Sequence, residues 1–482
     1  MKFLFSHPNF VPLRAIAKNT DMKTRIALLL TLLFTTLQGM WAQLSSDTVY
    51  VPIDQLPNAG YYLPAPPDTA SMDFVDDILQ WQWGKSQRPL ARGRQANIES
   101  MWLPRMMESV IAQVLELDTI SAEATPAMDR LLRRSYNTGN FSTVAAKKKY
   151  MRKRPFMQMG EDTWAKYDTD YLRTNGSYPS GHTAFGWATV LAFAEMWPEL
   201  QDTLLRRGFE FGENRIITGA HYQSDVNAGY LCAAAGIARA HSNPAFEEDI
   251  KAARAEYRRL KGLPANYDPT EKMGLPLGKK FLNAPVDTTS YRYPGEVLRY
   301  QRAKAFRLTA RGDSAIQNCT MSQDYFYKFF GHAMNIELSK ENTPFIAELM
   351  RKINKASLES ALALKKTTFR KRPFVQLKEP TTFPDGEESH RKTTSYASTH
   401  ANVAWGMALV LAEVAPECQD EILRLGYHYG YDRLITGYHW AADIEAARLL
   451  ACAVVARLHA DDMFRDLIRQ ARAEYLAKKN NF

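Results

Sequence analysis

The sequence predicts an all-α protein made of two tandem helical domains of one kind. Apolar residues occur mainly in long runs rich in Ala, Leu and Met, and few alternating segments indicate strands. A segment of roughly 200 residues, which is the size of a domain, occurs twice in the chain. The chain of 482 residues is also too long for one hydrophobic core. These observations together favour a duplicated helical domain.

The first predicted element is a leader with a signal peptide, over residues 1–42. Basic residues follow Met22, an apolar run extends from Ile26 to Leu37, and small residues end the segment near Ala42. This order is typical of a secretory signal peptide, and the run is short for a membrane span. We therefore expect a secreted or periplasmic protein whose mature chain has no integral membrane anchor. An uncleaved anchor is the alternative, and the 21 residues before Met22 leave the true start codon open.

The duplication is visible when the chain is compared with itself. Tyr62–Ser71 recurs as Phe281–Ser290, 219 positions later, and residues 147–257 match residues 365–475 without a gap at an offset of 218. Such a long repeat is a domain and not a solenoid unit. The predicted organisation is an N-terminal unit at 43–261, a linker rich in glycine and proline at 262–280, and a C-terminal unit at 281–482.

Each unit has two strongly apolar runs that we expect to be core helices. In the N-terminal unit they are Phe185–Met196 and Tyr230–Arg239, and in the C-terminal unit they are Met407–Val414 and Ala447–Leu458. Because these runs carry few polar residues on any side, one or two helices of each unit should be buried nearly all round.

A basic run precedes the first core helix. Lys147 and Arg154 are seven residues apart, and Pro155 follows directly. At about 100° per residue, seven steps of a helix return to nearly the same face, so we expect the two cations to point together. Pro155 is expected to end that helix. A solvated basic face is the alternative reading of this run.

The motif Pro179-Ser180-Gly181-His182 stands immediately before the apolar run that starts at Phe185. Free N–H groups at a helix start, a hydroxyl and a glycine can together hold an anion, and the imidazole of His182 can donate a proton. An ordinary helix cap on Ser180 explains the same tetrapeptide.

A third motif contains Arg215, His221 and Asp225. The last two are four residues apart, so we expect one helical face to set the carboxylate against the imidazole and hold its tautomer. Alone, such a pair is more often a structural hydrogen bond than a catalytic dyad.

In this order and spacing, the three motifs resemble the signature of the phosphatidic acid phosphatase type 2 superfamily, which also contains the vanadium haloperoxidases. The segments KYMRKRPF, SYPSGHTAFGWA and ENRIITGAHYQSDV look most like the class A bacterial nonspecific acid phosphatases. The resemblance covers each unit nearly end to end. Asn214 is a departure, because the family usually has serine before the arginine.

The resemblance implies a metal-independent phosphatase without a cofactor that hydrolyses phosphate monoesters. By position, His221 is the nucleophile that forms a phosphohistidine, Asp225 orients it, and His182 protonates the leaving group. The residue types suit phosphoryl transfer, which needs cations and N–H donors around the phosphate oxygens. The predicted phosphate-binding residues are Lys147, Arg154, Ser180, Gly181 and Arg215.

The C-terminal unit repeats this set with one change in the cradle. Its predicted catalytic residues are His439, His400 and Asp443, and its phosphate-binding residues are Lys365, Arg372, Ser398, Thr399 and Arg433. Thr399 replaces the cradle glycine, and a β-branched residue resists positive φ and close approach of an anion. Asp432 also places a negative charge beside Arg433, where the first unit has Asn214. We therefore expect an impaired or altered second site and a more active N-terminal site.

The net charge of +9 favours anionic partners. Nucleic acid is not expected, because the predicted site accounts for the basic run. The four scattered cysteines indicate no zinc site, and one disulfide remains open. Alternative functions are a vanadate-dependent haloperoxidase and a soluble lipid phosphate phosphatase. A non-enzymatic alternative for the C-terminal unit is a non-catalytic partner in an internal pseudo-dimer, and a homo-oligomer is also open.

Overall fold

The computed structural model describes residues 48–479 except 101–103, 166–168 and 272. Within these ranges the regular elements are helices and no strand is present, which confirms the all-α prediction. The predicted leader lies outside the described residues, so the signal peptide stays a prediction. Across the described ranges, no helix combines the length and hydrophobicity needed to cross a bilayer.

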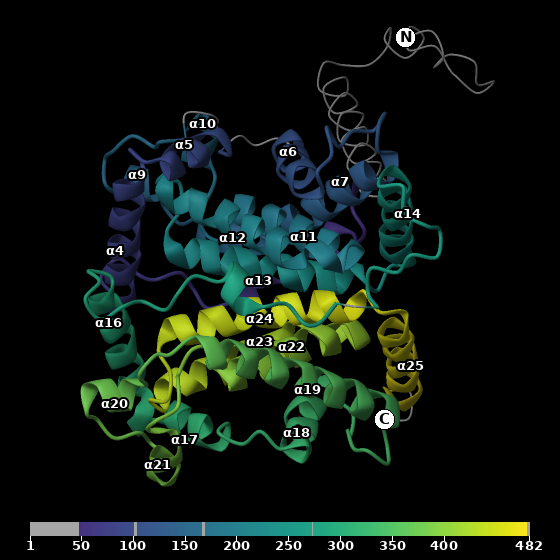
Figure 1. The fold of residues 1–482 in the computed structure, drawn as a ribbon. Coiled ribbons are helices and arrows are strands. Elements are labelled where there is room, and N and C mark those ends of the chain that lie inside the picture. The colour runs from purple at the N-terminus through teal and green to yellow at the C-terminus, as the bar shows by residue number, and fades with distance from the viewer. Residues whose placement is uncertain (1–47, 101–103, 166–168, 272, 480–482) are drawn as a thin grey trace, which may run out of the picture.

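The helices divide between the two halves of the chain (Figure 1). Those of the N-terminal half are α3 (Ala59–Tyr62), α4 (Met72–Gln87), α5 (Ala91–Ile98), α6 (Pro104–Leu115), α7 (Pro126–Phe141), α8 (Val144–Tyr150), α9 (Pro155–Gln158), α10 (Thr169–Thr174), α11 (Gly181–Met196), α12 (Gln201–Ile217), α13 (Gln223–Ala240) and α14 (Pro244–Leu260). Those of the C-terminal half are α15 (Gly278–Phe281), α16 (Tyr293–Lys304), α17 (Ala310–Gln317), α18 (Gln323–Met334), α19 (Pro344–Thr367), α20 (Pro373–Leu377), α21 (Glu387–His390), α22 (Thr399–Val414), α23 (Gln419–Ile435), α24 (Ala441–His459) and α25 (Asp462–Lys479).

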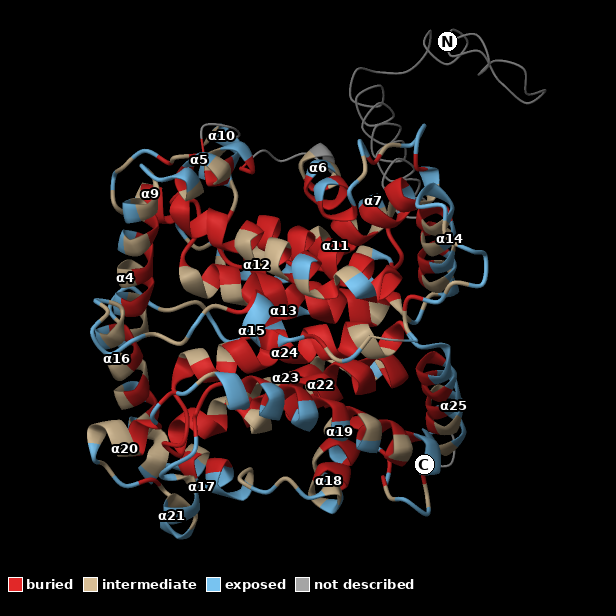
Figure 2. Ribbon diagram, viewed as in Figure 1, coloured by how far each residue is buried: buried red, intermediate tan, exposed pale blue. Residues whose placement is uncertain are grey.

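Helix α11 is the centre of the N-terminal unit, and α22 is its counterpart in the C-terminal unit. Every residue of α11 is buried, against α7, α12 and α13. Helix α22 is packed in the same way against α19, α23 and α24. Figure 2 shows both helices almost entirely in the colour of buried residues. The apolar runs without a polar face therefore form the core, as the sequence predicted.

The two units pack against each other through α11, α13, α22 and α24, which lie in the middle of Figure 1. Buried apolar residues of both units form one continuous cluster. The lead-in segments are exchanged between the units, because α3 contacts α23 and α15 contacts α12. The Asn58 N–H donates to Asp420 at 2.8 Å, and the Asn283 side chain donates to Glu213 at 2.6 Å. Each proline-rich lead-in thus ties its own unit to the other.

Two histidines related by the repeat meet where the units join. The rings of His241 and His459 are stacked with centroids 3.8 Å apart. The Nε2 of His241 lies 3.2 Å from a Glu195 oxygen, and the Nε2 of His459 lies 2.8 Å from a Glu413 oxygen. Each imidazole therefore faces a carboxylate of its own unit while it stacks on its copy. The four cysteines are free thiols in this structure.

Candidate active site

The structure brings Lys147 and Arg154 together, but not on one helix. Helix α8 ends before Met151, which has a φ of 40°. Arg154 directly precedes α9, whose first residue is Pro155. The predicted common helical face is wrong, and Pro155 begins a helix where we expected it to end one. Lys147 Nζ and Arg154 Nη2 instead donate to the same carbonyl, that of Gly176, at 2.6 and 3.4 Å. The cations meet because the chain turns back.

Ser180 and His182 stand at the start of α11. Ser180 is the N-cap of this helix, and its Oγ accepts from the Thr183 N–H at 3.3 Å, so the ordinary cap reading holds. The Nε2 of His182 lies 3.0 Å from the Ser100 carbonyl oxygen. Since a carbonyl only accepts, this nitrogen carries the proton in that contact. Gly181, which lies between Ser180 and His182 in the sequence, is the first residue of the helix.

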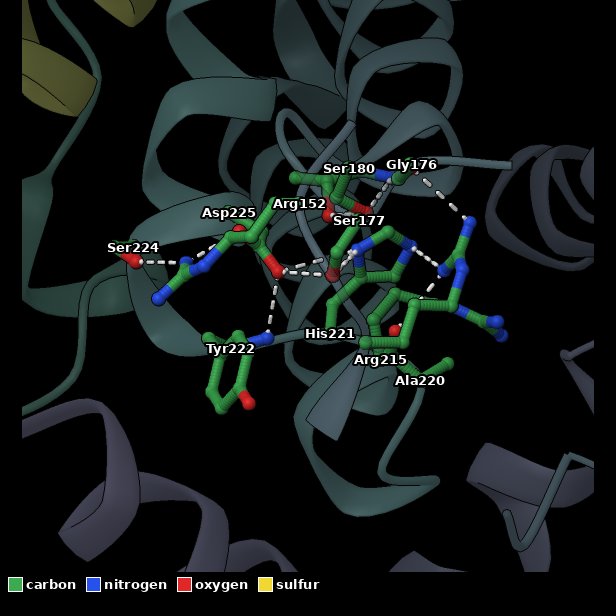
Figure 3. Close-up of polar contacts among 12 residues, drawn as sticks. Arg152, Gly176, Ser177, Ser180, Arg215, Ala220, His221, Tyr222, Ser224 and Asp225 are labelled. Atoms are coloured by element: carbon green, nitrogen blue, oxygen red, sulfur yellow. Dashed lines mark hydrogen bonds and ion pairs between the residues drawn. The ribbon is translucent and has the colours of Figure 1, made fainter. Parts of the chain in front are cut away.

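His221 lies in the loop before α13, whereas Asp225 lies in the first turn of that helix. The prediction that one helical face carries both residues is therefore wrong. They are nevertheless close, with the His221 Nδ1 3.5 Å from an Asp225 oxygen (Figure 3). The other nitrogen, Nε2, lies 2.8 Å from Arg154 Nη1. A guanidinium only donates, so Nε2 presents its lone pair to Arg154 while Nδ1 holds the proton toward the carboxylate.

A buried ion network behind His221 fixes Asp225. Arg152 donates to Asp225 at 2.6 Å and to Asp77 at 2.7 Å, while Ser224 donates to Asp77 at 2.6 Å. The Ser177 hydroxyl donates to the second Asp225 oxygen. The guanidinium of Arg152 thus lies between two carboxylates, and Figure 3 shows it on the far side of Asp225 from the imidazole.

The sequence reasoning did not identify Arg152, Asp77 or Ser177 as site residues. The internal copy could have identified them, because Arg152 and Ser177 recur as Arg370 and Ser395 at the offset of 218. The acidic residue recurs as Glu296, 219 positions after Asp77. No sequence signal marks the Ser100 carbonyl that holds His182, because any residue supplies a carbonyl.

Burial and clustered cations shape the proton affinities of the site. Burial, and then the charge of Arg154, lower the pKa of both His221 and Lys147 well below the usual values. Burial, followed by the charge of Arg215 on α12, also lowers the pKa of His182. Burial alone would raise the pKa of Asp225, but Arg152 and His221 hold it well below its usual range. An ionised carboxylate thus faces a neutral imidazole, in a pocket of excess positive charge.

The second site repeats this arrangement. Arg372 Nη1 lies 3.2 Å from the His439 Nε2, and an Asp443 oxygen lies 3.5 Å from the His439 Nδ1. Arg370 joins Asp443 to Glu296, with both distances 2.8 Å. Burial, followed by the charge of Arg372, lowers the pKa of Lys365 to about 7. The polar framework of the duplicated site is therefore assembled.

A cavity of about 200 Å³ marks this second site. His390 lines it and has no counterpart in the first unit, where the equivalent residue is Leu172. The His390 Nδ1 lies 2.7 Å from the Gly386 carbonyl. The cavity lining contains six of the predicted residues, together with His390 and Met321, which the sequence reasoning did not single out: Lys365, Arg372, Thr399, His400, Arg433 and His439.

Two predictions about the second site are wrong in part. Thr399 and Gly181 are each the first residue of a helix, and neither has positive φ, so the backbone argument against Thr399 is wrong. What remains is the added bulk of Thr399, a residue that lines the cavity.

Asp432 does not add a charge that the first unit lacks. In the first unit Asn214 donates to Glu99 at 2.6 Å, whereas in the second Asn318 donates to Asp432. Asn318 stands at the position equivalent to Glu99. The carboxylate and the amide have therefore exchanged places, and each unit keeps one of each.

Comparisons with known proteins agree with this geometry. The model of the PAP2 superfamily matches residues 134–246 and again residues 355–465, so each match contains one full set of the predicted catalytic and phosphate-binding residues. The non-specific acid phosphatase of Providencia stuartii is 36% identical over 215 residues, which are 45% of this chain and 87% of that protein. This chain belongs to the non-specific acid phosphatases of the PAP2 superfamily. The predicted enzyme class, a phosphatase, is confirmed with it.

Two further relatives are similar. The non-specific acid phosphatase of Salmonella typhimurium is 35% identical over 212 residues, 44% of this chain and 84% of that protein. An acid phosphatase of Zymomonas mobilis is 38% identical over 136 residues, 28% of this chain and 52% of that protein. The superfamily model matches the chain twice, and the Providencia stuartii relative aligns over 87% of its own length but only 45% of this chain. These findings confirm the tandem duplication.

Proposed function

We propose that this phosphatase hydrolyses phosphate monoesters through a phosphohistidine intermediate, and that its N-terminal site accounts for most of the turnover. The observation that carries the proposal is the position of His221. Its Nε2 lone pair faces a cation cluster, and its Nδ1 proton faces the buried carboxylate of Asp225. This is the tautomer and the polarity that an imidazole needs to attack phosphorus.

In the proposed reaction, a phosphate monoester binds among Lys147, Arg154 and Arg215. Three cations compensate the charge of the equatorial oxygens, and we therefore propose a metal-independent reaction. His221 Nε2 attacks phosphorus, the bond to the ester oxygen breaks, and His182 gives its proton to the departing alkoxide. Water then attacks the phosphohistidine, His182 takes a proton from that water, and the P–N bond breaks to release phosphate and neutral His221.

The preference for the N-terminal site rests on two differences between the copies. Thr399 lines the cavity of the second site and carries a side chain, where the first unit has Gly181. The Ser177 hydroxyl donates to Asp225, whereas the Ser395 hydroxyl is buried without a hydrogen bond among the described residues. The second carboxylate is therefore less firmly held. Since the rest of the second framework is intact, we propose weaker or differently selective turnover there, within an internal pseudo-dimer.

The proposal predicts a covalent phosphoenzyme. A panel of alkyl and aryl phosphate monoesters should be hydrolysed, and acid-sensitive, base-stable label should be trapped on His221 after rapid quenching with a phosphorus-labelled substrate. Peptide mapping by mass spectrometry locates the label. If turnover proceeds while no label is found on either His221 or His439, the phosphohistidine mechanism is wrong.

The lowered pKa of His221 predicts activity at acid pH. A nucleophile with a depressed pKa stays neutral as the pH falls, so the acidic limb of kcat/KM should lie below the usual histidine range. His182 must be protonated, and a bound phosphate dianion opposes the cations that lower its pKa. The alkaline limb of kcat should therefore report His182 in the complex.

The test of this pH dependence uses a His439→Ala background, so that one site is observed. Replacing His182 by alanine should remove the alkaline limb and should slow alkyl esters more than 4-nitrophenyl phosphate, whose leaving group needs no proton. An unchanged alkaline limb in His182→Ala would contradict the assignment of the acid.

A further inference from the structure

A cavity of about 330 Å³ lies between the two units, and its lining includes Asp77 and Ser224 of the ion network behind His221. Its walls come from α4 and α13 of the first unit and from α16, α23 and α24 of the second. In Figure 1, α13 and α24 run along the junction of the units, with α4 and α16 beside them. None of the four candidate catalytic histidines lines it. Exposed Pro64, Ala65 and Arg302 are among its lining residues, so the cavity reaches solvent.

The walls of this cavity are largely apolar and aromatic. Tyr178 and Tyr230 come from the first unit, and Tyr427 and Tyr431 from the second. Such surfaces suit a flat ring or a short hydrocarbon, because they offer contact area with little loss of side-chain entropy. The volume corresponds to a small organic molecule.

The acidic side chains that line the cavity are already paired with cations. Asp77 is bound by Arg152 at 2.7 Å, and Arg299 binds both Asp76 at 3.3 Å and Glu445 at 2.5 Å. Asp73 is likewise paired with Arg302, and Arg311 with Asp432. These ion pairs neutralise one another and leave little net attraction for a cation.

Arg448 is different from the other arginines of the lining. Only 4% of its surface is exposed, and no carboxylate of the described residues forms an ion pair with it. Its Nη2 donates to the Tyr427 carbonyl at 2.7 Å, while its buried Nε makes no hydrogen bond within the described structure. The neighbouring His428 also has a buried Nδ1 without a hydrogen bond there.

The copies differ at these two positions. Arg448 corresponds to Tyr230 and His428 to Glu210 in the first unit. The second unit has therefore gained a cation and lost an anion on this wall. The Arg448 guanidinium lies over the Tyr427 ring, 3.9 Å from its centroid, but this contact and the carbonyl leave its Nε without a hydrogen bond among the described residues. An anion that reached it would add a charge-assisted hydrogen bond.

We propose that the cavity between the units binds a small organic anion, with its carboxylate, sulfonate or phosphate group on Arg448 and its apolar body between the tyrosines. The ligand would not contact the catalytic histidines, because none of them lines this cavity. It exists only where the two units meet, and it depends on the side chain that distinguishes the second copy from the first.

The test measures binding of naphthalene-2-sulfonate by calorimetry to the full chain, with orthovanadate present to occupy the catalytic sites. One equivalent should bind per chain, about tenfold more tightly than the uncharged naphthalene-2-sulfonamide. In Arg448→Tyr, which restores the residue of the first unit, the two probes should bind with equal affinity while phosphatase activity is retained.

Arg351→Tyr, an exposed substitution on α19, is the matched control and should keep the tenfold preference. Because the comparison of two probes is made within the wild-type protein, it does not depend on the stability of any variant. Equal binding of sulfonate and sulfonamide to the wild type, no binding of either, or an unchanged preference in Arg448→Tyr would overturn the proposal.

Discussion

Replacing His221 and His439 together by alanine is expected to lower kcat for 4-nitrophenyl phosphate by at least about 10³-fold. The double variant lacks the only imidazoles whose Nε2 faces an arginine and whose Nδ1 faces a buried carboxylate among the described residues. With the nucleophile absent, the cations can still bind phosphate but cannot form the covalent intermediate. Binding of inorganic phosphate should therefore persist while turnover is lost.

The two single variants rank the sites. His221→Ala should remove most of the activity of the full chain, whereas His439→Ala should keep at least about half of it. We propose this because Thr399 lines the second site and the Ser395 hydroxyl makes no hydrogen bond among the described residues. His332→Ala, which changes an exposed histidine of α18, is the control and should leave kcat unchanged. The reverse ranking would show that the C-terminal site is the main one, and an active double variant would exclude both histidines as nucleophiles.

The fold could be predicted because its evidence is repeated along the chain. The run Phe185–Met196 has no polar face, and a helix of that kind can only be central, as α11 is. Because of the duplication, each such apolar run occurs twice in the sequence. The exchange of the lead-ins, in which α3 packs on α23 and α15 on α12, was not predictable, because proline-rich segments carry no pattern that names their partner.

The structure brings the predicted site residues close together, but their expected local geometry was partly wrong. Spacing of seven for Lys147 and Arg154, and of four for His221 and Asp225, suggested continuous helices. Neither pair lies on one continuous helix, because α8 ends before Met151 and α13 begins after His221. Contacts between residues distant in sequence cause both interruptions. Ser177 N–H, for example, donates to the Arg152 carbonyl at 2.8 Å and fixes the turn. Periodicity describes a local preference, and here tertiary contacts override it.

Arg152 provides the strongest test of the supporting network. Its side chain is 8% exposed, and those of Asp77 and Asp225 are 2% and 0% exposed. Arg152→Leu would leave two buried carboxylates without their shared cation, so we expect a loss of about 3–5 kcal/mol in the free energy of unfolding. Urea denaturation at pH 7, followed by helical circular dichroism, measures this loss.

The stability lost in Arg152→Leu should depend on pH. Arg152 depresses the pKa of Asp225, and a depressed carboxylate pKa contributes stability that is present above the unfolded value and lost as pH falls through the folded value. In Arg152→Leu that contribution is absent, and the folded pKa of Asp225 rises. The stability difference from wild type should therefore be largest at neutral pH and should shrink as the pH falls through the folded pKa of Asp225 in the variant, which burial raises above its usual value.

Arg370→Leu is the matched variant in the second unit, because Arg370 joins Asp443 to Glu296 in the same way. It should cost a similar free energy of unfolding and leave turnover at the N-terminal site unchanged. Arg152→Leu should in addition lower kcat at that site, since Asp225 would no longer be held against His221. Equal kcat values for the two variants in a His439→Ala background would mean that Arg152 stabilises the fold without positioning the catalytic carboxylate.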